Sequence, residues 1–167
     1  VAPLKTRIFT IANQKGGVGK TTVSASVGSV FAELRQDRVV AVDADTAFGK
    51  LGSRVDPKAL SSYWELASDQ HLESFADIRN RVGSNAAGLF VLAGEASPAR
   101  RRVLDPAVYR EAAARLDRHF TISIIDCGST MDTSSISRMS QYCKKSRVFL
   151  CLRGWDSIRF QRVTGSS

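Results

Sequence analysis

Short apolar runs alternate with amphipathic segments along most of this 167-residue chain, and this alternation constrains the fold more than any other feature. Four runs are rich in β-branched and aromatic residues, as expected for strands that are buried on both faces: residues 7–13, 38–45, 88–95 and 120–128. Parallel strands need long crossover connections, which are usually helices. The pattern therefore predicts an α/β protein with a mostly parallel central sheet and helices on both faces, in three layers.

The segments between these runs have helical periodicity. Residues 20–35 predict an amphipathic helix with one apolar stripe, made by Val23, Val27, Val30, Phe31 and Leu34. A second long helix is predicted over residues 105–120, with Asp105 as its cap and Pro106 at its first position. Shorter helices are expected over residues 59–68 and 72–82.

The composition excludes several protein classes. With 43% hydrophobic and 24% charged residues, the chain has the profile of an ordinary soluble globular domain. We find no apolar run near the roughly 18 residues of a membrane-spanning helix, and no secretory pattern at the start. Cys127, Cys143 and Cys151 lack metal-ligand spacing and predict free thiols in a reducing compartment. We therefore expect a cytoplasmic protein, and recruitment to the membrane periphery stays open.

The net charge of +8 is concentrated in the last part of the chain. Residues 131–167 carry seven Lys or Arg against two Asp, whereas the first 130 residues carry 17 basic against 14 acidic side chains. A high isoelectric point is therefore a weak argument for nucleic-acid binding by the body of the chain. Nonspecific DNA binding through the basic tail, or contact with a membrane surface, stays an open alternative.

The segment IANQKGGVGKTT, residues 11–22, joins the first predicted strand to the first predicted helix and carries three glycines and two lysines. A helix N-terminus offers unpaired amide hydrogens to an anion, glycines let the backbone approach it, and a lysine adds a full charge. Gly19, Lys20 and Thr21 fit the end of the phosphate-loop pattern GxxxxGK[ST], although Gln14 occupies the first glycine position. The segment predicts a polyphosphate site, with Lys15 as an additional lysine.

Acidic residues end two other predicted strands at the same edge of the sheet. Asp43 and Asp45 follow the second strand, and Asp126 ends the fourth. Ligands of such sheets bind beyond the carboxyl ends of the strands, so we expect these carboxylates to lie beside the phosphate turn. Taken alone, each of these acids could simply end a strand or cap a turn.

The segment KGGVGKTT resembles the deviant Walker A signature, KGGxGK[ST], of the ParA/MinD family of P-loop ATPases. VVAVDADTAFGKLG is similar to the DxD motif of that family, and ISIIDCG is similar to its Walker B motif. The segments DADTAFGKLGSRVD and FVLAGEASPARRRVLDP most resemble the corresponding sequences of MinD-like ATPases associated with type VII secretion. The resemblance implies a P-loop nucleotide-binding domain over residues 1–130 that binds and hydrolyses ATP with Mg²⁺.

The resemblance also implies a role for each site residue. The turn is expected to wrap the β- and γ-phosphates of ATP through Gly16, Gly17, Val18, Gly19, Lys20, Thr21 and Thr22. Lys20 would supply charge within the site, the Thr21 hydroxyl would ligate Mg²⁺, and Asp126 would hold the ion through water. Asp43 would support either the metal shell or its own loop. Asp45 would orient the attacking water.

Lys15 is expected to act across a dimer interface. The resemblance implies that this lysine reaches the ATP of a partner subunit and stabilises charge in the transition state, as a trans-acting arginine finger does. ATP would then be both the substrate and the link between the two subunits. We expect an ATP-dependent homodimer that positions or drives a protein cargo, which could be a secretion apparatus, a plasmid or chromosome, or a division protein.

The chain departs from the family pattern in its last part. Residues 131–167 match poorly and are interpreted as a basic tail, for which one helix and one strand of the same domain are suggested, the strand over residues 147–152. The later family segments that supply an adenine pocket and dimer surface have no recognisable equivalent. We therefore expect a C-terminally incomplete fold, through truncation or a disturbed reading frame after about Met131. The alternative function is a nucleotide-binding module with little turnover that docks on a partner protein.

Overall fold

The computed structural model describes residues 7–12, 19–44, 49–59, 61–94, 106–126, 146–152 and 158–161. Its strands are β1 (Arg7–Ala12), β2 (Val39–Asp43), β3 (Gly83–Ser84), β4 (Phe90–Leu92), β5 (Ile122–Asp126), β6 (Ser146–Leu152) and β7 (Ile158–Gln161). Its helices are α1 (Lys20–Leu34), α2 (Leu51–Val55), α3 (Tyr63–Ser68), α4 (Phe75–Arg79) and α5 (Pro106–Asp117). Within these described residues, no helix is both long enough and apolar enough to cross a bilayer.

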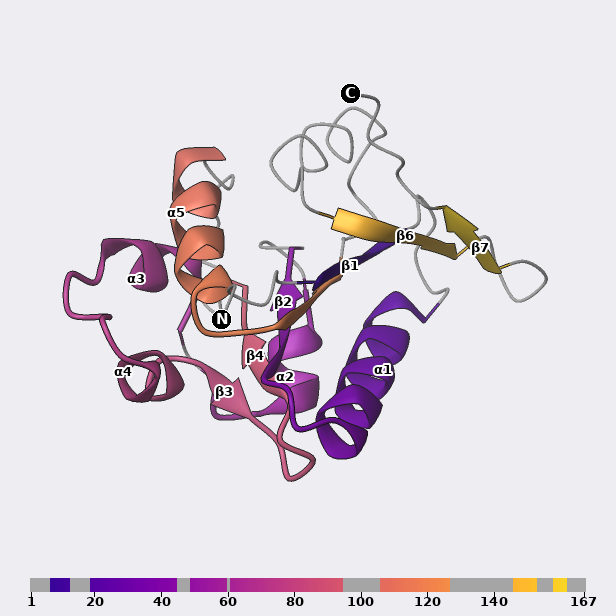
Figure 1. Ribbon diagram of the computed structural model, residues 1–167, viewed down its shortest axis with the longest axis horizontal. Coiled ribbons are helices and arrows are strands. Elements are labelled where there is room, and N and C mark those ends of the chain that lie inside the picture. Colours follow the sequence, from indigo (N-terminus) through magenta and orange to yellow (C-terminus); the bar gives the residue numbers. More distant parts are fainter. Residues whose placement is uncertain are drawn as a thin grey trace, which may run out of the picture.

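The described strands form one sheet in the order β3-β4-β2-β5-β1-β6-β7. The pairs from β4 through β6 are parallel, and β3 and β7 add antiparallel edges. The crossover through α1 runs from β1 toward β4, whereas the crossover through α5 runs back from β4 to β5. Crossovers of one hand that run in opposite directions place their helices on opposite faces. In Figure 1, α1 and α5 accordingly lie on the two sides of the central strands.

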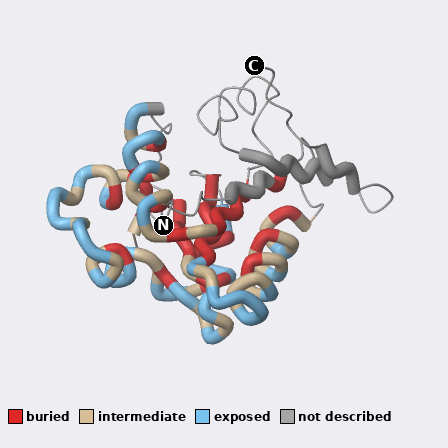
Figure 2. The backbone as a smooth tube through the Cα atoms, viewed as in Figure 1, coloured by how far each residue is buried: buried red, intermediate tan, exposed pale blue. Residues whose placement is uncertain are grey.

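The core has two clusters, one on each face of the sheet. Strand β2 shows the alternation, because Val40 and Val42 pack in the cluster beneath α3, α4 and α5. Val39 and Ala41 pack in the other cluster, beneath α1 and α2. Figure 2 shows that the buried residues gather on the central strands and on the helix sides that face them. The predicted three-layer α/β architecture with a mostly parallel sheet is confirmed.

Helix α1 approaches the sheet through small residues. Its buried positions are Lys20, Ser24 and Gly28, which recur every four residues along one side. A Cβ atom added at Gly28 would lie 2.9 Å from Cδ1 of Leu89 and 3.3 Å from Cδ1 of Ile124. A larger residue at position 28 would therefore force either these buried methyl groups or the helix to move.

The predicted single apolar stripe on this helix is wrong at two of its five positions. Val23, Val27 and Phe31 are half-buried and flank the small residues against the core. Val30 and Leu34 are 52% and 79% exposed. The close approach of Gly28 rotates the buried side of the helix away from them.

Other elements differ from expectation in their bounds. Capping boxes start α3 at Tyr63 and α4 at Phe75, so both helices begin later than predicted. Helix α2 and strands β3 and β7 form where the sequence predicted no helix or strand. The strand predicted over residues 147–152 is β6, which pairs with β1. Pro106 is the first residue of α5, whereas Asp105 lies outside the described residues.

Replacing Gly28 with valine should destabilise the fold by overpacking the contact between α1 and the sheet. We expect Gly28→Val to lower the free energy of unfolding by about 1–3 kcal/mol, as measured by urea denaturation. Ser26→Val is the matched control, since Ser26 lies on the exposed side of the same helix, and its effect should stay within about 0.5 kcal/mol. Equal stability of the two variants would contradict the packing described here.

Candidate functional site

The side-chain alternation of the strands places two acids on the α1 side of the sheet. Asp43 and Asp126 are the last residues of β2 and β5 and are register partners. Residues two positions earlier, Ala41 and Ile124, belong to the cluster beneath α1 and α2, so the acids share that face. Asp43 is 1% exposed and Asp126 is 4% exposed.

The start of α1 lies directly against the second of these acids. Thr21 Oγ1 donates a hydrogen bond to Asp126 Oδ2 at 2.7 Å, across 105 residues of sequence. Gly19 immediately precedes the helix and has a φ of +84°. Residues that carry a Cβ atom rarely adopt this left-handed backbone conformation. Lys20 follows as the first helical residue and is 8% exposed. The structure thus brings together three of the predicted site residues: Lys20, Thr21 and Asp126.

The oxygen atoms of Thr21 and Asp126 fit a magnesium ion. Mg²⁺ prefers oxygen ligands and usually keeps several of its waters. The hydroxyl of Thr21 is a suitable ligand, and the Asp126 carboxylate beside it, 2.7 Å away, is a suitable acceptor for a water bound to the ion. Among the described residues, no three His, Cys, Asp or Glu gather in one metal-binding group. An ion held here would take its other ligands from water or phosphate, as Mg²⁺ commonly does.

Asp43 contacts the loop that follows its own strand. Its Oδ2 accepts a hydrogen bond from the backbone N–H of Leu51 at 3.2 Å, at the start of α2. A Cβ atom added at Gly49 would lie 2.1 Å from Oδ1 of the same carboxylate, so the backbone passes very close to it. Such contacts are what we expect if Asp43 supports its own loop, which is one of the two roles predicted for it. Its role in a metal shell stays a prediction.

An arginine that no sequence pattern indicated lies beside the first turn of helix α1. Arg54, on α2, donates a hydrogen bond from Nη1 to Thr22 Oγ1 at 2.9 Å. Thr22 is the third residue of α1 and is exposed. A single arginine on a five-residue helix belongs to no motif, and only the packing of α2 beside α1 reveals its position.

The remaining predicted site residues lie outside the described part of the chain. These are Lys15, Gly16, Gly17, Val18 and Asp45. Their predicted roles in phosphate binding, water orientation and dimer contact therefore stay predictions.

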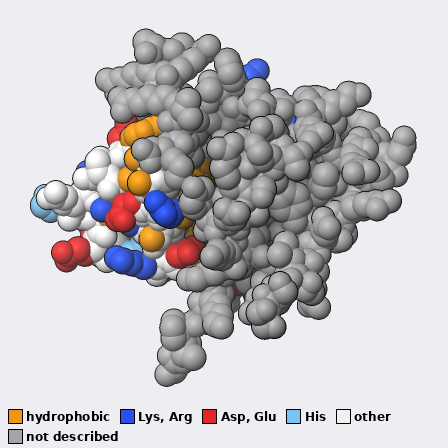
Figure 3. All heavy atoms as spheres, turned by 90° about the horizontal axis from the view of Figure 1, so that it is seen from above, with side chains coloured by type: hydrophobic (Ala, Val, Ile, Leu, Met, Phe, Trp, Pro, Cys, Tyr) orange, Lys and Arg blue, Asp and Glu red, His pale blue; other side chains and the backbone are white. Residues whose placement is uncertain are grey.

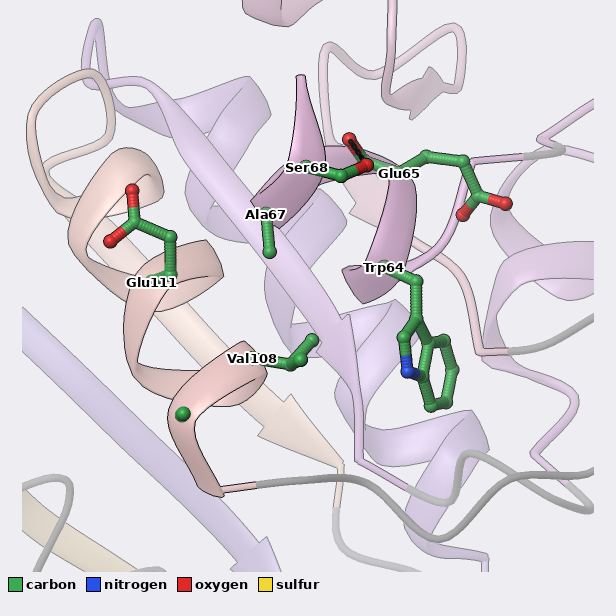
Figure 4. A pocket seen from close by; sticks show the side chains of 7 residues that line it. Trp64, Glu65, Ala67, Ser68, Val108 and Glu111 are labelled. Atoms are coloured by element: carbon green, nitrogen blue, oxygen red, sulfur yellow. Dashed lines mark hydrogen bonds between the residues drawn. The ribbon is translucent and has the colours of Figure 1, made fainter. Parts of the chain in front are cut away.

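A separate hollow lies between α3 and α5 and contains none of the predicted site residues. It has a volume of about 480 Å³ and is lined by Trp64, Glu65, Ala67, Ser68, Ala107, Val108 and Glu111. Figure 4 shows Trp64 and Val108 at its sides. Seen from above, the described surface around α3, α4 and α5 mixes charges of both signs with hydrophobic side chains (Figure 3). This part of the surface lacks the single-sign charge expected of a nucleic-acid-binding face.

Known proteins share both the sequence pattern and the fold. Residues 9–148 match the family described as the CobQ/CobB/MinD/ParA nucleotide binding domain. The ESX-1 secretion-associated protein EspI of Mycobacterium tuberculosis is 34% identical over 115 residues, which cover 69% of this chain and 17% of EspI. The chain therefore spans only about a sixth of this curated relative.

Two solved structures share the fold over most of this chain. The septum site-determining protein MinD of Pyrococcus horikoshii, complexed with Mg-ADP, superposes with a TM-score of 0.66 at 25% identity. The match covers 88% of this chain and 57% of that protein. Cobyrinic acid a,c-diamide synthase of Mycobacterium smegmatis, with bound ADP and magnesium, gives a TM-score of 0.63 at 26% identity, over 88% of this chain and 59% of the synthase.

A side chain at position 49 should clash with the Asp43 carboxylate. We expect Gly49→Ala to lower the free energy of unfolding by about 1–3 kcal/mol in urea denaturation, whereas Lys50→Ala at the exposed neighbour should change little. In an Asp43→Ala background, the cost of Gly49→Ala should fall to within about 0.5 kcal/mol, because the clashing oxygens are gone. An unchanged cost in that background would show that Asp43 does not set the path of the loop.

Proposed function

Because the chain belongs to the CobQ/CobB/MinD/ParA nucleotide-binding domain family, we propose that it is a Mg²⁺-dependent ATPase that acts as a nucleotide-switched dimer. The family match confirms the predicted resemblance. The observation that carries the proposal is the hydrogen bond between Thr21 and Asp126 beside the first turn of α1. It places a hydroxyl, a carboxylate and Lys20 where a helix N-terminus would face phosphates.

The choice of nucleotide and ion follows from the relatives and from the donor set. The P. horikoshii MinD structure contains Mg-ADP, and the M. smegmatis synthase contains ADP and magnesium. In this chain, the oxygen atoms of Thr21 and Asp126 suit the same ion. We therefore infer that ATP and Mg²⁺ bind at the carboxyl end of β1, between α1 and β5.

The side chains around the turn would divide the work of phosphoryl transfer. Lys20 would contact the phosphates as a nearly buried point charge, and its low exposure would strengthen that interaction. Thr21 and Asp126 would hold Mg²⁺, which neutralises charge on the phosphates when it is bound. Asp45 would orient the attacking water, and Lys15 would reach the nucleotide of the partner subunit. The last two roles rest on the KGGVGKTT and DxD patterns.

The cellular task is inferred from the curated relative whose name states a process. EspI is a secretion-associated protein, and the region that matches it makes up most of this chain. We therefore propose that the dimer works in the cytoplasm on secretion, partitioning or the positioning of a protein cargo.

A second candidate is a nucleotide-binding module that docks on a partner with little turnover. The observation that favours it is the partly apolar hollow between α3 and α5, which lies apart from the phosphate turn. A phosphate-release assay on this chain separates the candidates, because steady turnover would exclude the module. DNA binding through the basic tail stays a prediction, because most of the tail lies outside the described residues.

Removing the Asp126 carboxylate should remove the contribution of magnesium to nucleotide binding. In isothermal titration with ADP, we expect Mg²⁺ to improve the affinity of the parental chain, and Asp126→Asn to lose about tenfold or more of that gain. Asp37→Asn, at an acid just beyond the opposite end of α1, is the control for loss of charge. The metal assignment fails if Asp126→Asn shows the parental gain.

Two substitutions should separate turnover from dimerisation. Asp45→Ala should bind ATP with parental affinity but lower steady hydrolysis on the order of 10²-fold or more, because the water is no longer oriented.

Lys15→Gln should weaken ATP-dependent dimerisation more than nucleotide binding, as judged by analytical sedimentation with and without ATP. Parental hydrolysis by the first variant, or parental sedimentation of the second, would refute the respective role.

A further inference from the structure

Arg54 brings a guanidinium group to the turn at which α1 begins. Its Nη1 donates to Thr22 Oγ1 at 2.9 Å, and Thr22 follows the residue that contacts Asp126. The amides of this turn are the ones that a helix leaves without intrahelical partners, and they favour anions. A second permanent positive charge, in addition to that of Lys20, therefore lies at the anion-binding end of the helix.

Helix α2 holds this arginine in a fixed position. Leu51 and Val55 anchor the helix in the core at 0% and 7% exposure. A Cβ atom added at Gly52 would lie 2.6 Å from Cβ of Ala93, so the helix packs directly on the chain that follows β4. Arg54 is therefore carried by an element that cannot easily shift.

Acidic side chains accept backbone amides at both ends of α2. Asp43 accepts from Leu51 at the start, and Asp56 accepts from the N–H groups of Ser84 and Lys58, at 3.0 and 2.9 Å, just beyond the end. These amides, first that of Ser84, lower the pKa of the Asp56 carboxyl. A side chain presented by such a fixed helix loses less freedom when it binds a ligand than one on a loose segment.

The observed contact uses little of what the arginine can offer. A guanidinium has five N–H donors arranged to bind the oxygens of phosphate in pairs. Within the described residues it makes the one hydrogen bond to a neutral hydroxyl, and both side chains are exposed. An exposed hydrogen bond from a guanidinium to a hydroxyl contributes little to stability, whereas phosphate offers the guanidinium an opposite charge and two oxygens at once.

We propose that Arg54 is a phosphate-binding residue of the nucleotide site. Its guanidinium contacts phosphate oxygens of the nucleotide and links α2, together with the loop held by Asp43, to the bound ligand. The inference rests on the proposed nucleotide binding, but it does not depend on hydrolysis or on dimerisation.

The test is the affinity for ADP of three variants at position 54, measured by isothermal titration with Mg²⁺. Arg54→Ala should bind ADP about tenfold more weakly than the parental chain. Arg54→Lys should recover part of the loss because it keeps the charge, whereas Arg54→Gln should behave like alanine although it can still bond to Thr22. Thermal unfolding without ligand should be nearly parental for all three, since the side chain is exposed.

Arg79→Ala is the matched control, because Arg79 is also an exposed basic residue in the last turn of a five-residue helix. It should leave ADP affinity unchanged. The inference is overturned if Arg54→Ala binds ADP as tightly as the parental chain does. It is also overturned if Arg54→Gln restores the affinity and Arg54→Lys does not, because Arg54 would then act only through its hydrogen bond to Thr22. If the parental chain itself binds no ADP, the proposed function fails, a result distinct from either of these.

Discussion

The hydrogen bond from Thr21 to Asp126 fixes the start of α1 against the end of β5, and the other features of the site are arranged around it. It requires Asp126 to point to the α1 side of the sheet, as the side-chain alternation of β5 dictates, and the register of β2 and β5 puts Asp43 beside it. It also requires α1 to lie close to that sheet, which Ser24 and Gly28 allow. Packing two turns along the helix therefore determines the geometry of a polar contact at its first turn.

Two carboxylates at equivalent register positions have different tasks. Asp126 faces the hydroxyl of Thr21, whereas Asp43 accepts the amide of Leu51 and leaves room only for glycine at position 49. The difference arises from the position of α2 in the chain. This helix begins eight residues after Asp43. The Asp43 carboxylate accepts a hydrogen bond from the N–H group of Leu51, the first residue of α2, and so links β2 to α2. The site is thus built from both of the described helices that lie on this face of the sheet, α1 and α2.

The fold, and the meeting of the α1 start with the end of the fourth predicted strand, could be predicted from the sequence because each signal had a clear cause. Continuous apolar runs predicted buried parallel strands, and the spacing of Gly19, Lys20 and Thr21 predicted the phosphate turn. Helix bounds were missed where short capping boxes, such as Ser62 with Glu65, compete with weak periodicity. The buried side of α1 was misassigned because apolarity was weighed above the close approach that Gly28 permits. Arg54 could not be found at all, since its significance lies in a contact between two helices.

The order of the strands has a consequence for how the protein is made. β1 and β2 do not pair with each other, and each instead pairs with β5, which is translated last of the three. A growing chain therefore carries its phosphate turn for about a hundred residues before the acid that completes it leaves the ribosome. Before β5 is made, β1 and β2 lack the strand that pairs with both of them, and the N–H and C=O groups along those edges have no strand partner. Exposed strand edges of this kind make nascent chains prone to aggregate. Strand β5 therefore completes the centre of the described sheet, and Thr21 can contact Asp126 only after β5 has been inserted between β2 and β1.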